Sequence, residues 1–251
     1  MVPARRLSVL AFLFLCFAAT VGPPALAGKL TDAVKLRDVA LVRSLLAAGE
    51  DVQEKVKGDY PLNVASVFGP VETVAALLEA GAKIEQPGRD GLRPLHNAVI
   101  QGRREIVALL LQKGVVVDSK ENWGRSALLS FAATGGKDTE IARMLLAAGA
   151  DPEIKSSIDD NSYSVLQYAA ETGNTELGEL LIAARVDVNY RNPDGDMALH
   201  FAIESNHTEI AKLLISHGAD VNMVNRRGQS PLFIAGRNPE IQRLLVAAGA
   251  K

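Results

Sequence analysis

The sequence predicts an all-α solenoid of about seven helix-turn-helix units joined by short β-hairpin loops. A Leu-Leu-x-x-Gly type segment recurs seven times, and the intervals between successive last positions are 32, 33, 35, 36, 33 and 31 residues. A second landmark centred on a leucine stands 15 residues before most of these segments. Aromatic residues make up only 5% of the chain, so Ala, Leu, Val and Ile must supply the core. A period near 33 indicates units that bury their apolar faces against one another.

Composition narrows the class of protein. The chain has 251 residues, with 27 Lys and Arg against 29 Asp and Glu, so its net charge is −2. A hydrophobic share of 48% is too high for a disordered chain. Because the chain has no dense basic stripe, we do not expect it to bind nucleic acid or an anionic membrane. One cysteine excludes an intramolecular disulfide, and four histidines leave little material for a zinc site.

Residues 1–27 have the pattern of a secretory signal peptide. Arg5 and Arg6 precede an uncharged apolar run over 7–21, and Ala25-Leu26-Ala27 is a small-x-small cleavage signal. The alternative is a membrane anchor, but the run has about 15 residues against the roughly 20 needed to span a bilayer. We therefore expect an exported chain of residues 28–251, periplasmic or secreted, with no membrane association after cleavage. That chain lacks cysteine, and its net charge is 25 − 29 = −4.

Each landmark has a structural meaning. Proline in the second landmark suits the first position of a helix. Between the two helices of a unit the sharp turn favours a left-handed residue, and that slot holds Gly69, Gly102, Gly135, Gly173 and Asn206. Glycine after most Leu-Leu pairs is typical of a helix C-cap. The predicted repeats cover approximately residues 29–54, 55–86, 88–119, 121–155, 159–190, 192–223 and 225–251.

These landmarks resemble the ankyrin repeat. The sixth copy is close to that motif, with Leu199-His200-Phe201-Ala202, then Ile210-Ala211-Lys212-Leu213-Leu214, then Gly218-Ala219-Asp220-Val221-Asn222. The resemblance covers about residues 29–251. It implies that His96 and His200 brace the turns by hydrogen bonding. It also implies that a protein partner binds the concave side, which hairpin tips and first helices form.

Departures from the pattern concentrate in the middle of the chain. The fourth copy has two extra residues near Gly135-Gly136-Lys137, and a longer link over 155–162 precedes the fifth copy. Arg185 replaces the capping glycine. The first copy lacks the second landmark, and the seventh is two residues short, so both are expected to cap the stack. Insertions in repeat proteins map to loops on one face, often the binding face.

No catalytic constellation is visible in the sequence. Gly136-Lys137 lacks the earlier glycine of a phosphate-binding loop, and Asp138 stands where Ser or Thr must bind magnesium. The histidines form no i, i+4 pair and have no carboxylate at ligand spacing. We assign no catalytic, cofactor-binding or metal-binding residues and expect a protein without enzymatic activity.

A partner-binding surface is the remaining candidate site. Apolar side chains stand at predicted tip and first-helix positions of the second to fifth copies, close to an arginine. A soluble surface would carry polar residues there, and exposed aromatics beside arginine are typical of interface hot spots. The candidate residues are Phe68, Leu92, Ile100, Trp123, Arg125 and Tyr163. The alternatives are that Phe68 and Ile100 lie partly under neighbouring helices, and that the Trp123 ring folds back over the fourth repeat.

We therefore expect an exported, monomeric protein that binds another protein. Family resemblance suggests support of a stress-defence enzyme or neutralisation of a toxin as an immunity protein. The alternatives are a host-directed ankyrin effector secreted beyond the cell, and an enzyme whose site is not recognisable in the sequence.

Processing at the predicted cleavage site is directly testable. N-terminal sequencing of the exported protein should begin at Gly28, because the basic start, short apolar run and Ala25-Leu26-Ala27 together define a cleavable signal. A mature protein that retained Met1 would contradict this prediction and favour an anchored protein.

Overall fold

The computed structural model describes residues 28–156, 162–236 and 238–251; the predicted signal peptide, residues 1–27, lies outside the described residues. Within those ranges the chain forms fourteen α-helices in seven antiparallel pairs and one short 3₁₀ turn, η1 (Arg89–Gly91). The first helices of the pairs are α2 (Lys29–Lys35), α4 (Pro61–Phe68), α6 (Pro94–Ile100), α8 (Ala127–Ala133), α10 (Val165–Thr172), α12 (Ala198–Glu204) and α14 (Pro231–Ala235). The second helices are α3 (Val39–Ala47), α5 (Val71–Glu79), α7 (Arg104–Gln112), α9 (Thr139–Ala147), α11 (Thr175–Ala183), α13 (Thr208–Ser216) and α15 (Pro239–Ala247).

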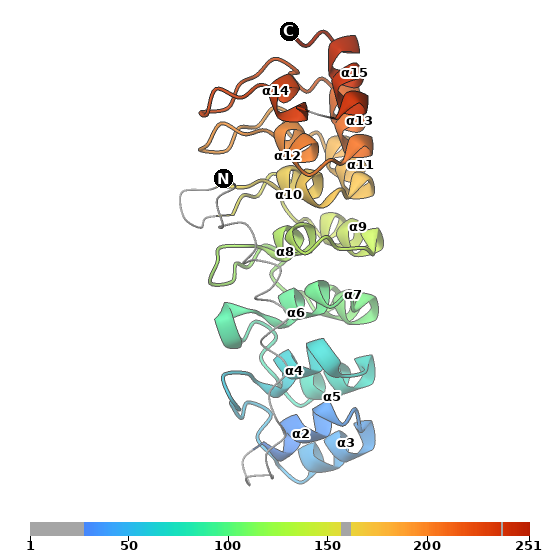
Figure 1. Cartoon of the computed structure of the whole chain (residues 1–251). Helices are drawn as coiled ribbons and strands as arrows, with labels where there is room; N and C mark the ends of the chain where they lie inside the picture. Colours follow the sequence, from blue (N-terminus) through green and yellow to red (C-terminus); the bar gives the residue numbers. More distant parts are fainter. Residues whose placement is uncertain (1–27, 157–161, 237) are drawn as a thin grey trace.

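The pairs, numbered repeats 1 to 7, stack into an elongated solenoid. Figure 1 shows two columns, with the first helices nearer the side on which the connecting loops project. We call these the inner helices and the others the outer helices. Each inner helix packs on the next inner helix and each outer helix on the next outer helix. The predicted all-α repeat architecture is therefore confirmed.

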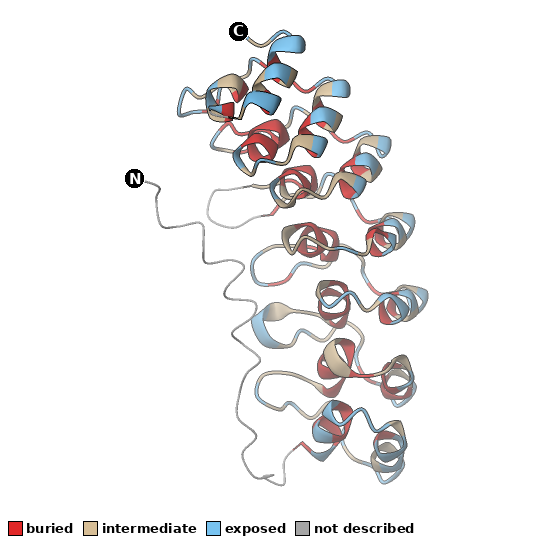
Figure 2. Ribbon diagram, turned by 45° about the vertical axis from the view of Figure 1, so that its right-hand side comes forward, coloured by how far each residue is buried: buried red, intermediate tan, exposed pale blue. Residues whose placement is uncertain are grey.

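A continuous aliphatic core runs between the two columns (Figure 2). Leucines of the two landmarks repeat along it and are almost fully buried, as Leu95 and Leu110 in repeat 3 and Leu199 and Leu214 in repeat 6 illustrate. Among the described residues, Phe131 and Phe201 are the aromatic side chains in this buried core. Burying each leucine contributes about 1.5–3 kcal/mol. Because each repeat contacts only its neighbours, the core is completed by the stacking of adjacent repeats.

The loops are simpler than the predicted β-hairpins. No strand forms within the described ranges, where the pairing consists of isolated antiparallel bridges, Val56 with Asp59 and Lys155 with Ser164. Single backbone hydrogen bonds close several of the other loops, as between the Glu121 N–H and the Arg125 carbonyl at 3.1 Å. The segments are too short for a ladder, so each loop is a tight turn aimed away from the helices.

The turns within helix pairs confirm the left-handed slot at four of its five predicted positions. Gly102, Gly135, Gly173 and Asn206 have φ of +64°, +65°, +73° and +61°. The prediction for Gly69 is wrong, since its φ is −72°. Pro70 follows it, and a residue before proline is pushed into extended backbone by contact with the proline ring.

The turns that end the outer helices require the same left-handed conformation. Glycine takes it in six repeats, at Gly49, Gly81, Gly114, Gly149, Gly218 and Gly249. In repeat 5 the slot holds Arg185, whose φ is +63°. A β carbon in this conformation crowds the backbone carbonyl, at a cost of roughly 1–2 kcal/mol. Repeat 5 therefore carries a local strain that its six counterparts avoid.

Replacing Arg185 with glycine should stabilise the protein. We expect Arg185→Gly to raise the free energy of unfolding by about 1 kcal/mol, because the left-handed penalty exceeds the entropy cost of glycine. Urea denaturation measures this difference. The matched control is Ala184→Gly, one residue earlier, where φ is −77° and glycine should lower the free energy by about 0.5–1 kcal/mol. A destabilised Arg185→Gly protein would contradict the strain argument.

Candidate functional site

Side chains of the inner helices hold the projecting loops in place. The third residue of an inner helix donates a hydrogen bond to a backbone carbonyl in the loop of the next repeat, and we call this contact the brace. His96 Nε2 lies 3.1 Å from the Arg125 carbonyl, and His200 Nε2 lies 3.1 Å from the Met223 carbonyl. The predicted bracing role of both histidines is confirmed, and the contact crosses from one repeat to the next.

Amide side chains make the same brace in two other repeats. Asn63 Nδ2 donates to the Leu92 carbonyl at 3.0 Å, and Gln167 Nε2 donates to the Asp196 carbonyl at 2.8 Å. Repeats 4 and 7 carry Leu129 and Phe233 in this position. Leu129 is buried and apolar, so the loop leading into repeat 5 has no brace of this kind from repeat 4.

Burial keeps the His96 imidazole neutral. It lowers the pKa of His96 from 6.5 to about 4, since the charged ring would lose its hydration there. Its second nitrogen, Nδ1, is buried with no hydrogen-bond partner among the described residues, so a proton added there would have no acceptor. Burial also lowers the pKa of His200, whose Nδ1 accepts from the Met197 N–H at 3.0 Å.

The loop of repeat 4 presents the single tryptophan. The buried Glu121 carboxylate accepts the backbone N–H groups of Trp123 and Arg125 at 2.7 and 3.0 Å. The Asn122 N–H also donates to the Asp90 carbonyl of the preceding loop at 3.1 Å. Desolvation raises the pKa of Glu121, although these hydrogen bonds and the nearby Arg125 favour the ionised form. The loop is fixed at both sides while the Trp123 side chain remains 37% exposed.

Aromatic side chains form a row beside this loop. The Arg125 guanidinium lies over the Tyr168 ring, 5.9 Å from its centroid. Tyr163 then packs on Tyr168 and, edge-on, on Phe201, with centroid distances of 5.4 and 5.3 Å. Arg125 is therefore half-buried within the chain and does not form an open rim. Sequence reasoning missed Tyr168 and Phe201, although both directly follow the brace position of their inner helices.

The structure arranges the six predicted binding residues in two rows and not in one cluster. Leu92, Arg125 and Tyr163 occupy equivalent places at the foot of successive loops, with Trp123 at a loop tip. Phe68 and Ile100 end the inner helices α4 and α6, which have eight and seven residues and are therefore about 10–12 Å long. Phe68 and Tyr163 also pack against the core, as the alternative for Phe68 anticipated. Binding by these residues remains a prediction.

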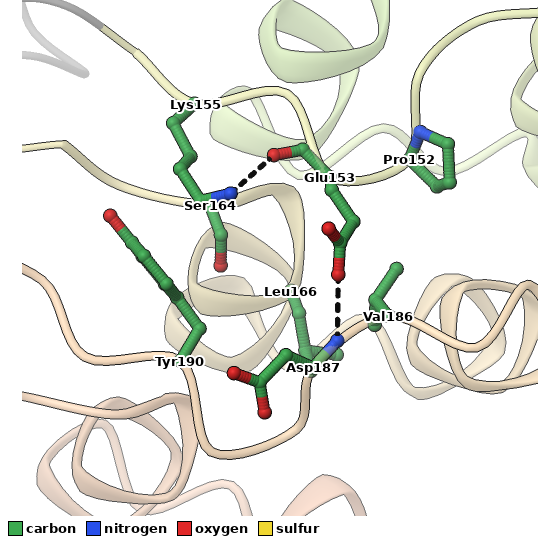
Figure 3. A pocket seen from close by; sticks show the side chains of 8 residues that line it. All are labelled: Pro152, Glu153, Lys155, Ser164, Leu166, Val186, Asp187 and Tyr190. Atoms are coloured by element: carbon green, nitrogen blue, oxygen red, sulfur yellow. Dashed lines mark hydrogen bonds between the residues drawn. The ribbon is translucent and has the colours of Figure 1, made fainter.

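A small pocket lies between the loops of repeats 5 and 6 (Figure 3). Lys155 Nζ donates to the Glu153 carbonyl at 2.9 Å and lies 4.7 Å from the centroid of the Tyr190 ring. The Glu153 carboxylate accepts the Asp187 N–H at 3.0 Å. The space measures about 90 Å³, room for a few waters at about 30 Å³ each. Polar groups that line the pocket already bind one another, and the bond from Asp187 to Glu153 connects the loops of two repeats.

The described ranges hold no group of three or more His, Cys, Asp or Glu side chains arranged to bind a metal ion. In the same ranges, every helix is too short or too polar to cross a bilayer.

Comparison with known proteins identifies the repeat. The family model for ankyrin repeats in three copies matches residues 30–121, 115–192 and 166–251. The chain belongs to the ankyrin-repeat family. The ankyrin repeat domain of human ASB11 superposes with a TM-score of 0.79 at 23% identity, covering 88% of this chain and 98% of that domain. This likeness shows the shared ankyrin fold.

Ankyrin relatives are mostly much longer proteins. Human "SH3 and multiple ankyrin repeat domains protein 2" is 27% identical over 175 residues, which are 68% of this chain and 9% of the relative. An L-asparaginase of Dirofilaria immitis is 28% identical over 183 residues, 69% of this chain and 30% of the relative. The chain thus spans less than a third of these relatives. Ankyrin repeats typically form a non-enzymatic scaffold that binds protein partners.

The buried histidine brace predicts acid sensitivity. The pKa of His96 is lower in the folded than in the unfolded state. The neutral His96 imidazole therefore contributes fully to the free energy of unfolding above pH 6.5, and this contribution is lost as the pH falls toward 4. The loss should approach about 3 kcal/mol. His96→Gln keeps a donor, as Gln167 does, and should flatten the dependence of unfolding free energy on pH in that window.

Urea denaturation between pH 7 and pH 4 measures the effect. Asn63→Gln is the matched control, because it alters a brace without removing a titrating group and should leave the slope against pH unchanged. An equally steep slope for His96→Gln and the original chain would contradict the assignment.

Proposed function

We propose that this ankyrin-repeat chain is an exported, non-enzymatic protein that binds another protein through the loop side of repeats 3–5, with Trp123 as the principal anchor. The observation that supports this most is the pairing of an exposed tryptophan with a fixed backbone. The buried Glu121 carboxylate holds the Trp123 and Arg125 amides at 2.7 and 3.0 Å. Tryptophan is among the residues most often found at interface hot spots.

Preorganisation is the physical advantage of this arrangement. A partner that binds a mobile loop must order it, and this ordering opposes binding. Here the Asn122 amide bond to Asp90 and the His96 brace to the Arg125 carbonyl fix the loop before a partner arrives. Binding would therefore order little more than the Trp123 side chain itself.

Neighbouring groups supply the rest of the proposed surface. Leu92, Arg125 and Tyr163 lie at the feet of successive loops and are half-buried. The Tyr163 ring packs on Tyr168, which carries the Arg125 guanidinium on its face. These side chains are held by contacts within the chain, so they would act as a rigid floor beside Trp123. Phe68 and Ile100, in the second row, would extend the surface only for a partner that reaches the far ends of the inner helices.

The predicted signal peptide supports a place outside the cytoplasm, in a bacterial periplasm or beyond it. Candidate roles there are support of a stress-defence enzyme and neutralisation of a toxin. Both roles need a protein that binds without changing its partner chemically, which agrees with a surface that offers a fixed aromatic anchor. A monomer leaves this loop face open for a partner.

Truncation of the tryptophan tests the anchor. The partner is first identified by co-purification with the tagged chain from its own compartment, and its affinity is then measured for the purified pair. Trp123→Ala should weaken binding by about 2 kcal/mol or more, as hot-spot truncations do. Its free energy of unfolding should change by no more than about 0.5 kcal/mol, because the side chain lies at the surface.

Val116→Ala is the matched control, since Val116 is a well-exposed apolar residue in the segment after α7. That variant should keep full affinity. A large loss of stability in Trp123→Ala would show that the ring packs on repeat 4, and unchanged affinity would place the binding surface elsewhere.

A further inference from the structure

The turns that join inner to outer helices form a second series of contacts between repeats. Arg103 donates to the Val67 and Gly69 carbonyls of the preceding turn at 2.9 and 2.7 Å. Asn174 donates to the Gly136 carbonyl at 2.7 Å, and His207 contacts the Glu171 carbonyl at 3.1 Å. Asn238 donates to the side-chain oxygen of Asn206. These bridges close the junctions between repeats 2 and 3, 4 and 5, 5 and 6, and 6 and 7.

The junction between repeats 3 and 4 is built differently. Among the described residues no side chain from the turn of repeat 4 bridges back to the turn of repeat 3. The two repeats are instead joined beside the turn by Arg104, whose guanidinium binds both oxygens of Asp138 at 2.8 and 2.7 Å. A hollow of about 260 Å³ remains between the turns, lined by Ile100, Gly102, Phe131 and Lys137 among others.

A change of side-chain size explains the hollow. Phe131 takes the place held by alanine in the six other repeats, at Ala33, Ala65, Ala98, Ala169, Ala202 and Ala235. Gly136 crosses its ring so closely that a β carbon there would lie 2.2 Å from the ring. The two extra residues of repeat 4 thus carry the backbone around Phe131, and the turn does not close on repeat 3.

The lining combines an apolar floor with a positive rim. Val99 and Phe131 are buried beneath the hollow, and Ile100 is half-buried beside it. Lys137 is exposed on the rim and has no ion pair within the described ranges. Arg103, next to Gly102, does not line the hollow, because its guanidinium binds the Val67 and Gly69 carbonyls of repeat 2. The rim carboxylate, Asp138, is already bound by Arg104.

We propose that this hollow is a second recognition site, which accepts one large apolar side chain of a partner peptide whose next residue is acidic. Its volume is below the roughly 300–1,000 Å³ typical of drug-sized ligands, and it fits a single side chain. The exposed Lys137 ammonium, which has no ion pair within the described ranges, favours a carboxylate at the rim. The site lies at the opposite end of the inner helices from the Trp123 loop, and it shares Ile100 with the second row of the proposed binding surface.

NMR with short peptides tests the proposal on the ¹⁵N-labelled protein. The probe is acetyl-Gly-Phe-Glu-Gly-amide; acetyl-Gly-Phe-Lys-Gly-amide and acetyl-Gly-Ala-Glu-Gly-amide are its matched controls. Saturable shifts are expected at the amides of Gly102, Gly135 and Gly136, which line the hollow. The Phe-Lys peptide should bind about two- to fivefold more weakly, the range for one exposed ion pair. The Ala-Glu peptide should give no saturable shift.

Two charge-reversal variants decide the role of the rim. Lys137→Glu should reverse the preference between the Phe-Glu and Phe-Lys peptides, whereas Lys83→Glu, an exposed site on another loop, should preserve it. Equal binding of the two peptides, shifts away from the three glycines, or an unchanged preference in Lys137→Glu would overturn the proposal. Binding of 3-phenylpropionate without binding of the peptide would also overturn it, in favour of a small aromatic acid. None of these results depends on Trp123 or its partner.

Discussion

The hydrogen bond from the third residue of an inner helix to the loop of the next repeat is the contact on which the rest of this solenoid depends. It links a buried helix to an exposed loop and one repeat to its neighbour in a single interaction. Asn63, His96, Gln167 and His200 differ in shape and charge, yet each presents an N–H group to a carbonyl in the following loop. The Leu92, Arg125 and Asp196 carbonyls also accept a backbone N–H within their own loops, so the brace adds a second hydrogen bond that joins each loop to the buried helix.

Repeat 4 contains several departures from the pattern of the other repeats. It carries Leu129 in the brace position, Phe131 in place of alanine, two extra residues in its turn and a buried acid in its loop. In a solenoid each unit contacts only its neighbours, so such departures distort two junctions and leave the other repeats intact. The exposed tryptophan and the hollow of about 260 Å³ both belong to this repeat or to its edge. The irregular features that could take part in recognition are thus found in or beside one repeat of a regular scaffold.

Internal repetition made much of this fold predictable. Seven in-phase copies predicted the helix pairs, the leucine core and the positive φ of Asn206, because aligning the copies shows which residue types recur at each position. Gly69 was misread because the slot was assigned by alignment, while the neighbouring Pro70 decides its backbone. The candidate site was harder. The position of Arg125 over Tyr168 depends on distances between repeats, and no pattern within one copy encodes them.

In the loop of repeat 4, the residue at the position of Glu121 fixes the backbone that carries Trp123. In repeats 6 and 7 the residue equivalent to Glu121 is asparagine, and Asn225 accepts the equivalent pair of loop amides, each at 3.0 Å. A carboxylate there makes charge-assisted hydrogen bonds, which are stronger than those of an amide, but its burial carries a desolvation cost that raises its pKa. The positive charge of Arg125 offsets part of that cost, and the Tyr168 ring in turn supports Arg125. The fixed backbone of Trp123 therefore depends on contacts that extend into repeat 5, so the tip and its aromatic floor act as one unit.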